Sequence, residues 1–465
     1  MALVESFSGI RGIYDKDLTE SIAIRYIHAF SAFLKNKAKK NSITSVIGTD
    51  TRPSGLKLCD AIIGTIDCSF IDVGILPTPA IEFAVRHFGA DGGIIITASH
   101  NEPYWNGFKF LDSSGAVLNE KDMDVVISNA KFLKNFHKIQ EREVREKNPE
   151  ALKGYSNFLF EVVGKANLVK IKSSGQKIVI DPNGGTGIAA KKSLEQAGVS
   201  VVGVNVVYGE FRRTVEPTED SMFYLKNVIE ESNADFAAGF DCDADRVEVL
   251  LPGGQFVSGN QILALAVDEI LSNSKNPAND IVVVNDATSG VVRQVAEKYG
   301  AKIKEVEVGE TNVVKAMEKF KSKIGGEGSS GGVIIAPSKC RDGILTLLML
   351  MSIIAKKGKR LSDIVDGLPR YHYIRKNVEF NPRCHDKIKS FIKKHYTNKG
   401  FGIAENSGSK GSLKVTTGKN SFVWFRASKT EADSFRIISD SDKKVEAEKL
   451  MEGALDVFKK ANEQK

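Results

Sequence analysis

The sequence predicts an α/β fold, with three similar mixed α/β domains in series and a smaller C-terminal α+β domain. Through most of the chain, short β-branched runs alternate with helical patterns, which is typical of parallel strands joined by crossover helices. From about residue 369 the pattern changes to two strand-like runs and a closing amphipathic helix. No strict sequence repeat accompanies the three similar units.

The elements can be assigned in order from hydrophobic periodicity. The first unit has expected strands at 45–50, 69–74 and 92–97, and an expected helix at 79–88. The second unit has strand-bearing segments at 176–187, 199–207 and 234–251, and a helix at 189–197. The third unit has strands at 280–286 and 302–309 around a helix at 290–300. The C-terminal region has strands at 421–428 and 435–441 and a helix at 443–461.

Three stretches are candidate domain junctions: a charged segment at 138–154, a Pro-Gly-Gly turn at 251–255, and residues 366–372. They divide the chain into four expected domains, which are 1–150, 151–253, 254–367 and 368–465.

Composition limits the class of protein. The chain has 465 residues, of which 42% are hydrophobic and 26% charged, as in soluble globular proteins with sizeable cores. Lys and Arg exceed Asp and Glu by 65 − 58 = 7, and a mild positive charge suits nucleic acid or anionic metabolites. The lysine clusters at 35–40 and 356–360 lack interleaved aromatic residues, so we expect solvated helix ends and no nucleic-acid partner.

The expected location is the cytoplasm. The five cysteines form no CxxC pair, which indicates reduced thiols. The N-terminus does not have the pattern of a signal peptide. The apolar run at 344–355 is too short to span a bilayer and predicts a buried helix, so no membrane partner is expected.

A loop of alternating aspartates, DCDADR, lies between two strand-like runs. In a tight loop Asp241, Asp243 and Asp245 can converge, and three hard oxygen ligands suit Mg²⁺. The loop does not match an EF-hand. Counted from Asp241, the sixth position requires Gly but holds Arg246, and the twelfth requires Glu but holds Pro252. An all-oxygen metal site beside an arginine suits phosphoryl transfer.

A second loop, TASHNEPYWNGFKF, follows the strand at 92–97 and supplies a phosphoryl acceptor in Ser99. We expect a turn that ends at Lys109. The G-x-S-x-G elbow of α/β-hydrolases and the P-loop of kinases are both absent from the sequence. These absences argue against an α/β-hydrolase and against a P-loop kinase.

These two loops resemble the phosphoserine loop and the metal loop of the α-D-phosphohexomutase superfamily, and further motifs follow in family order over nearly the whole chain. They are SGIRG (8–12), GTDTRPSG (48–55), DPNGGTG (181–187), GGEGSSGG (325–332) with RDG (341–343), and RASKTE (426–431). The resemblance implies an isomerase whose four domains surround a central cleft and bind small-molecule hexose phosphates.

The resemblance also implies roles. Ser99 would be a phosphoserine that completes a Mg²⁺ site with the three aspartates. It would relay a phosphoryl group between C6 and C1 through a hexose 1,6-bisphosphate, which also acts as activator. Arg11, Lys109 and Arg246 would neutralise phosphate in transit, and either His100 or Lys109 would serve as acid and base. The implied substrate-binding residues are Glu327, Ser329 and Ser330 in the sugar loop and Arg426, Ser428, Lys429 and Thr430 in the C-terminal phosphate loop.

The sequence departs from the family pattern at three of these loops. Cys242 replaces a usual glycine, Gly332 stands where many members have a histidine in a loop that is one residue longer, and Ala432 replaces a proline. The sugar loop looks closest to that of archaeal-type phosphoglucosamine mutases, which favours glucosamine phosphate. A phosphomannomutase or phosphoglucomutase of broad specificity, a Mg²⁺-dependent sugar phosphatase and a non-catalytic sensor are the alternatives. We expect a monomer or a homodimer.

Overall fold

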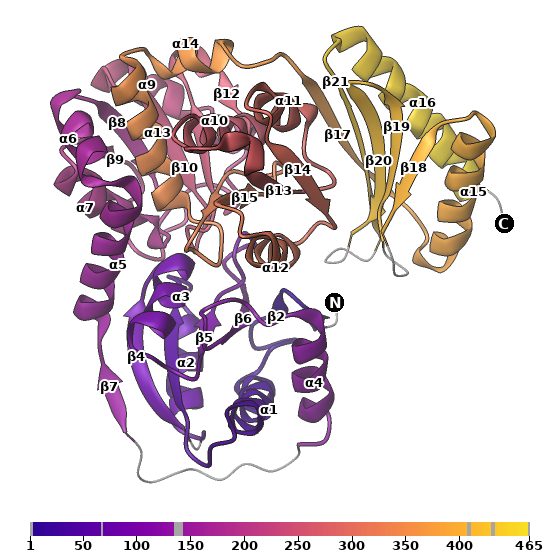
Figure 1. Cartoon of the computed structure of the whole chain (residues 1–465). Coiled ribbons are helices and arrows are strands. Elements are labelled where there is room, and N and C mark those ends of the chain that lie inside the picture. The colour runs from indigo at the N-terminus through magenta and orange to yellow at the C-terminus, as the bar shows by residue number, and fades with distance from the viewer. Residues whose placement is uncertain (1–2, 67, 134–142, 407–410, 429–432, 464–465) are drawn as a thin grey trace. The chain divides into compact units, whose positions relative to one another are not determined.

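The N-terminal part of the chain forms a mixed seven-stranded sheet in the order β1-β2-β6-β5-β3-β4-β7 (Figure 1). Its strands are β1 Val4–Ser6, β2 Gly9–Ile13, β3 Thr44–Thr49, β4 Ser69–Ile75, β5 Gly92–Ile96, β6 Trp105–Asp112 and β7 Val144–Glu146. Its helices are α1 Glu20–Ala38, α2 Gly55–Ile63, α3 Thr78–His87 and α4 Glu120–Ala130. The computed structural model describes residues 3–66, 68–133, 143–406, 411–428 and 433–463.

Apolar side chains of α1, α2 and α4 share one core cluster with strand residues of this sheet. Helix α1 shows why the sequence folds this way: Thr19 caps its first turn by accepting a hydrogen bond from the Ile22 amide, and Phe30 stacks on Phe110 of β6. On the sheet, β3 pairs in parallel with β4 and β5, as the sequence predicts.

The expected turn ending at Lys109 is wrong. The chain re-enters the sheet at Trp105, and Lys109 lies within β6, directly opposite Ile95 of the antiparallel neighbour β5. Phe108 and Phe110 are buried, so the alternating apolar pattern of a strand prevails over the turn-forming residues before it. The mixed character predicted for this domain is confirmed, since β2 and β6 run antiparallel to their neighbours while β3 is parallel to β4 and β5.

A five-stranded sheet follows, in the order β12-β11-β10-β8-β9. Its strands are β8 Lys177–Asp181, β9 Ser200–Gly203, β10 Phe236–Phe240, β11 Val247–Leu250 and β12 Phe256–Val257. The helices here are α5 Asn148–Val163, α6 Lys165–Ser173, α7 Ala189–Gln196, α8 Glu219–Met222 and α9 Leu225–Ser232, with 3₁₀ turns η1 Thr186–Ile188 and η2 Pro252–Gly254. Strand β10 is parallel to β8 and antiparallel to β11, so the aspartate loop is a hairpin connection.

In the third segment β13 pairs in parallel with both β14 and β15. Its elements are α10 Gly259–Ser272, η3 Pro277–Asn279, β13 Ile281–Asn285, α11 Gly290–Lys298, β14 Lys302–Val306, α12 Glu310–Phe320, β15 Ile324–Gly326, β16 Val333–Ile335, α13 Gly343–Lys357 and α14 Leu361–Asp366. Residues 343–354 of α13 are all buried, which confirms the buried helix predicted there. Among the described residues, no helix has the length and apolar character needed to cross a membrane.

The C-terminal segment is an antiparallel sheet in the order β17-β21-β20-β19-β18, with α15 and α16 packed on it (Figure 1). Its elements are β17 His372–Glu379, η4 Pro382–Cys384, α15 His385–Asn398, β18 Gly402–Glu405, β19 Leu413–Gly418, β20 Ser421–Ala427, β21 Ser434–Ser441 and α16 Lys444–Glu463. This confirms the expected α+β character.

The chain divides into two compact units. The first contains residues 1–262 and 330–366, and the second contains residues 263–329 and 367–465. The Ser99 loop and the aspartate loop both belong to the first unit.

Candidate active site

Ser99 lies in the loop that leaves the buried strand β5 and is itself only 2% exposed. Its backbone has a φ of 53°, a left-handed conformation that is uncommon for a residue other than glycine and is often found at functional sites. Its hydroxyl Oγ is 3.3 Å from Oδ2 of Asp241. The fold therefore directs the predicted acceptor at the predicted metal loop.

Arg52, which sequence reasoning did not assign to the site, holds the Ser99 loop in place. Its Nη2 donates to the carbonyl oxygens of Ser99 at 2.6 Å and Asn101 at 2.7 Å, and its Nη1 donates to the carbonyl of Glu102 at 3.0 Å. The guanidinium is fully buried, and Asp50 accepts from its Nε at 3.0 Å. One guanidinium thus holds three carbonyl oxygens of the loop backbone.

Asp50 is the second part of this support. Its Oδ2 accepts a hydrogen bond from Thr97 Oγ1 at 2.6 Å, and that same Thr97 oxygen accepts from the Ser99 amide at 2.8 Å. Burial raises the pKa of Asp50, while the Arg52 guanidinium opposes the rise. The Asp-Thr-Arg stretch directly after a buried strand was the available sequence signal for this pair.

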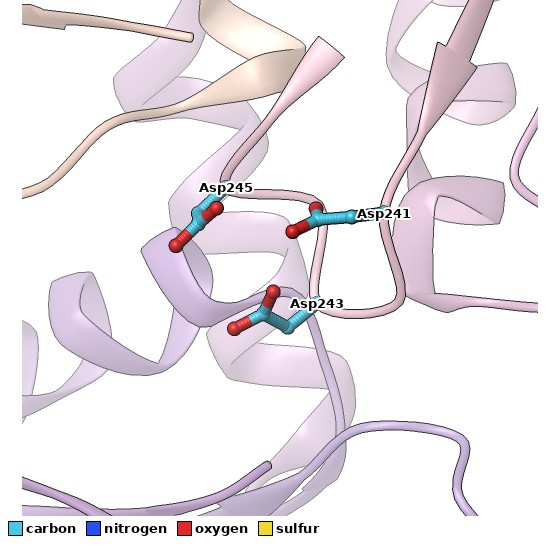
Figure 2. A group of neighbouring side chains, drawn as sticks. All are labelled: Asp241, Asp243 and Asp245. Carbon is cyan, nitrogen blue, oxygen red and sulfur yellow. The ribbon is translucent and has the colours of Figure 1, made fainter. Parts of the chain in front are cut away.

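The three aspartates converge as predicted. Each offers an oxygen atom within 4.8 Å of the others, all three are buried, and Figure 2 shows their carboxylates drawn together by one tight loop. Ala244 within the loop has a φ of 53°, which produces the sharp bend between the second and third aspartates. Burial and the neighbouring carboxylates raise the pKa of Asp241 well above its usual range.

The aspartate loop fits a divalent cation. In the described part of the chain, Oδ1 of Asp243 and Oδ1 of Asp245 are buried and accept no hydrogen bond. Buried carboxylate oxygens without a donor are costly unless a cation binds them. Hard carboxylate oxygens are the ligands that Mg²⁺ prefers, so these residues, together with a phosphoryl oxygen on Ser99, are suited to hold it.

Lys109 reaches the aspartates from β6. Its Nζ lies 2.8 Å from Oδ2 of Asp243 and 3.1 Å from Oδ2 of Asp245. Thr78, at the start of α3, donates to the same Asp243 oxygen at 2.7 Å. Burial alone would raise the pKa of Asp245, but the charges of Arg341 and Lys109 outweigh burial and hold that pKa below its usual range.

Two predicted arginines also lie near the aspartates. The backbone amide of Arg246 donates to Oδ1 of Asp241 at 3.2 Å, and its guanidinium pairs with Glu216 at 3.0 Å. Arg11 donates to Oδ1 of Asn101 at 2.9 Å, and burial lowers the pKa of Arg11 to about 10. Both guanidiniums remain positively charged at neutral pH.

His100 lies within the electrostatic reach of these arginines. The charge of Arg246, burial and the charge of Arg11 together lower the pKa of His100 well below its usual value. Its Nδ1 is buried without a hydrogen-bond partner among the residues the structure describes. These surroundings favour the neutral form of the imidazole and make it a weak base.

Arg341 is a further residue that sequence reasoning did not single out. It is buried, its Nη2 lies 3.4 Å from Oδ2 of Asp245, and its Nη1 donates to Oγ of Ser330 at 2.9 Å. The family resemblance assigns the RDG motif that contains Arg341 only to the expected sugar loop. Arg341 connects that loop to the aspartates within the first unit.

The remaining predicted residues lie mainly in the second unit. Glu327 is buried, and its Oε1 accepts from Nδ2 of Asn285 at 3.1 Å and from the Gly309 amide at 2.8 Å. Arg426, at the end of β20, is 3.6 Å from Glu307, and burial lowers the pKa of Arg426. That these residues share a substrate with Ser99 stays a prediction.

The other loop positions are less informative. Ser329 and Ser330 are partly exposed, and the amide of Ser428 donates to the Ser434 carbonyl at 2.8 Å. Lys429, Thr430 and Ala432 lie outside the described residues.

Two departures from the family pattern fit the structure. Cys242 is buried, with its Sγ 3.6 Å from Oγ1 of Thr51, so the loop holds this side chain in its interior. Gly332 has a φ of 99°, and a Cβ there would lie 2.3 Å from the carbonyl oxygen of Asp245. A histidine cannot replace Gly332 in this loop conformation.

Comparison with known families matches three segments of the chain. Residues 5–135, 153–254 and 258–371 match alpha/beta/alpha domains I, II and III of phosphoglucomutase/phosphomannomutase. A phosphoglucomutase/phosphomannomutase of Thermococcus kodakarensis is 32% identical over 462 residues, or 97% of this chain and 98% of that protein. A phosphoglucosamine mutase of Prochlorococcus marinus is 32% identical over 356 residues, or 75% of this chain and 76% of that protein.

Solved structures support the fold. A phosphoglucomutase/phosphomannomutase family protein from Burkholderia thailandensis matches with a TM-score of 0.82 at 20% identity, covering 99% of this chain and 98% of that one. An N-acetylphosphoglucosamine mutase of Aspergillus fumigatus, crystallised with GlcNAc-6P and magnesium, matches with a TM-score of 0.64 at 14% identity, covering 99% and 96%.

Replacement of Arg52 should remove the hydrogen bonds that hold the Ser99 loop and destabilise the protein. We expect Arg52→Ala to lower the free energy of unfolding by about 3–5 kcal/mol, because Asp50 is left as a buried charge without its partner. Urea denaturation measures this loss. The control is Arg360→Ala: the side chain of Arg360 is 82% exposed and pairs with Asp363, and its loss should change stability by less than about 1 kcal/mol. Equal losses in the two variants would contradict the buried clamp.

Mg²⁺ should stabilise the protein through the aspartates. We expect Asp243→Asn to weaken Mg²⁺ binding roughly tenfold or more, because the site loses one of its three charged ligands. Calorimetric titration and the rise in melting temperature with Mg²⁺ both report this binding without any assay of turnover. Asp363→Asn, at an exposed position, is the control and should titrate like the unaltered protein. Equal Mg²⁺ affinity in both variants would place the cation elsewhere.

Proposed function

The chain belongs to the phosphoglucomutase/phosphomannomutase family of phosphohexomutases, and from this premise we propose that it isomerises hexose phosphates through a phosphoryl group carried on Ser99. The observation that carries the proposal is the position of Ser99 Oγ, 3.3 Å from Asp241 in a buried cluster of three carboxylates. This arrangement suits phosphoryl transfer, in which a metal and nearby cations share the charge of the transferred group.

The proposed reaction has two transfers. First, a free hydroxyl of the hexose monophosphate attacks the phosphorus on Ser99; the bond from phosphorus to Oγ breaks, and the hydroxyl proton passes to a base. The product is a hexose 1,6-bisphosphate. Second, Ser99 Oγ attacks the other phosphorus, the bond from that phosphorus to the sugar oxygen breaks, and the sugar oxygen takes up the proton. No water is consumed and no phosphate is released.

The side chains of the first unit have distinct tasks in this proposal. Arg11 and Arg246 neutralise the phosphoryl oxygens, and His100 or Lys109 carries the proton. Mg²⁺, when held by the three aspartates, supplies further positive charge at the transferred phosphoryl group. The Arg52 clamp and the strained Ser99 backbone keep Oγ in one orientation, so that little reorganisation is needed at the moment of transfer.

The substrate class follows from the second unit and the relatives. Glu327 presents a buried carboxylate suited to ring hydroxyls, and Arg426 presents a guanidinium suited to the second phosphate. We propose glucosamine phosphate as the preferred substrate, because several similar proteins carry the name phosphoglucosamine mutase. Broad specificity for mannose and glucose phosphates is the alternative, since the Thermococcus kodakarensis relative, which covers 97% of this chain, is named for both.

The deciding experiment is turnover of the 1-phosphates of glucosamine, mannose and glucose, with Mg²⁺ and a trace of the matching 1,6-bisphosphate. We expect formation of the 6-phosphate without release of free phosphate, fastest with glucosamine. Both products are measured in the same sample. Release of free phosphate without isomerisation would replace the mutase with a phosphatase, and no turnover of any of the three sugars would refute the proposed activity.

Ser99 is tested separately. We expect Ser99→Ala to reduce turnover by at least roughly 10³-fold, because the acceptor oxygen is lost, while hexose phosphate still binds. Rapid-quench assays with labelled 1,6-bisphosphate should also show no labelled protein. Ser114→Ala is the matched control. Ser114 lies just after β6, donates a hydrogen bond to the Asp112 carboxylate and has no proposed role. Labelling of the Ser99 variant at the wild-type level would assign the phosphoryl group to another residue.

A further inference from the structure

Glu248 is a buried carboxylate that the proposed reaction does not use. It lies on β11, three residues after Asp245, and is 6% exposed. Its Oε1 accepts a hydrogen bond from the Gly331 amide at 2.5 Å, and its Oε2 has no hydrogen-bond partner in the described part of the chain. Burial raises the pKa of Glu248 to about 8, although the Gly331 amide and Arg246 oppose the rise. Burying a carboxylate costs free energy unless hydrogen bonds or nearby cations offset the loss of hydration.

The partner of Glu248 is the end of the sugar-recognition loop, residues 330–332. This segment packs directly on the backbone of β11 and of the aspartate loop. A Cβ at Gly331 would lie 1.7 Å from the Val247 carbonyl oxygen, and a Cβ at Gly332 would lie 2.3 Å from the Asp245 carbonyl oxygen. Glycine at both positions allows the loop to approach closely enough for the Gly331 amide to reach Glu248.

A second contact secures the same segment. Arg341 donates from Nη1 to Oγ of Ser330, while its Nη2 lies 3.4 Å from Asp245. The loop end is therefore tied twice to the strand and loop that carry the metal ligands, by a backbone bond at Glu248 and by a side-chain bond at Arg341. Of these two ties, only that of Glu248 makes no ion pair with the aspartates, so it can be altered without removing an ion pair of Asp245.

We propose that Glu248 is a positioning residue that fixes the end of the sugar-recognition loop on β11 and thereby determines which hexose phosphate the enzyme prefers. This inference rests on the proposed function, because the sugar-binding role of the loop is part of it. Ser330, an expected substrate-binding residue of the same loop, directly precedes Gly331 in the first unit, so the path of the chain at Gly331 constrains where the Ser330 side chain can lie. Glu248 would act through the loop backbone, without touching the sugar.

Two substitutions separate the hydrogen-bond acceptor from the volume of the side chain. Glu248→Leu keeps the volume and removes the acceptor, whereas Glu248→Gln retains a carbonyl oxygen for the Gly331 amide. Glu82→Leu is the matched control, because Glu82 is another buried carboxylate of the first unit, on α3, outside both loops. Each variant is compared with the unaltered full chain.

The first measurement is amide hydrogen exchange of the peptide that contains residues 324–335. We expect a protected Gly331 amide in the unaltered protein and in Glu248→Gln, and exchange about tenfold faster or more in Glu248→Leu. Glu82→Leu should leave this peptide unchanged. An unprotected Gly331 amide in the unaltered protein, or equal exchange in all variants, would overturn the inference even if Glu248→Leu failed to fold.

The second measurement is kcat/KM for the 1-phosphates of glucosamine, mannose and glucose. We expect Glu248→Leu to change the ratios among the sugars by about tenfold, mainly through KM, with Mg²⁺ affinity unchanged, and Glu248→Gln to restore the original ratios. Unchanged ratios in Glu248→Leu, or equal effects of both substitutions, would refute the role in preference. If the unaltered protein isomerised none of the sugars, the proposed function would fail, whereas the exchange result would still test the Glu248 contact.

Discussion

The first unit depends on the cost of holding three carboxylates together away from water. Asp241, Asp243 and Asp245 approach within 4.8 Å in a buried loop, where like charges repel strongly and hydration is lost. The structure offsets this cost with cations from separate parts of the sequence: Lys109 from β6 and Arg341 from the segment before α13. The charge cluster therefore ties together segments that the chain order keeps apart, and two oxygens still remain for a metal ion.

The Ser99 loop is held by a different kind of interaction. Around the aspartates the contacts are between opposite charges, which a bound phosphoryl group or metal would redistribute. Around Ser99 they are bonds from Arg52 to backbone carbonyls and from the Ser99 amide to Thr97. In the proposed reaction, a phosphoryl group that arrives and departs would change the charge near Oγ but would leave these backbone bonds in place. Ser99 Oγ would thus keep its position through both proposed transfers.

Sequence reasoning succeeded where the signal is local. A short loop between two strands brings alternating aspartates close together, so their convergence could be predicted. The position of Ser99 could be predicted because it follows the end of β5. It failed where the partner is remote in sequence: Arg52 acts on carbonyls 47 to 50 residues away, and Glu248 accepts from an amide 83 residues away. No rule based on residue spacing predicts such distant pairs. Strand β6 was not predicted for the same reason, because its conformation depends on pairing with β2 and β5.

The geometry at the end of the sugar loop limits how sugar preference can arise in this chain. Gly331 lies against the Val247 carbonyl oxygen of β11 and Gly332 against that of Asp245 in the aspartate loop, so neither position has room for a side chain. Under the proposed function, a loop with Gly332 in place of the family's histidine would discriminate among sugars by other means. The side chain of Ser330 and the backbone path at the glycines would be such means. Because Glu248 and Arg341 bond to Gly331 and Ser330, the proposed specificity would also depend on residues outside the loop.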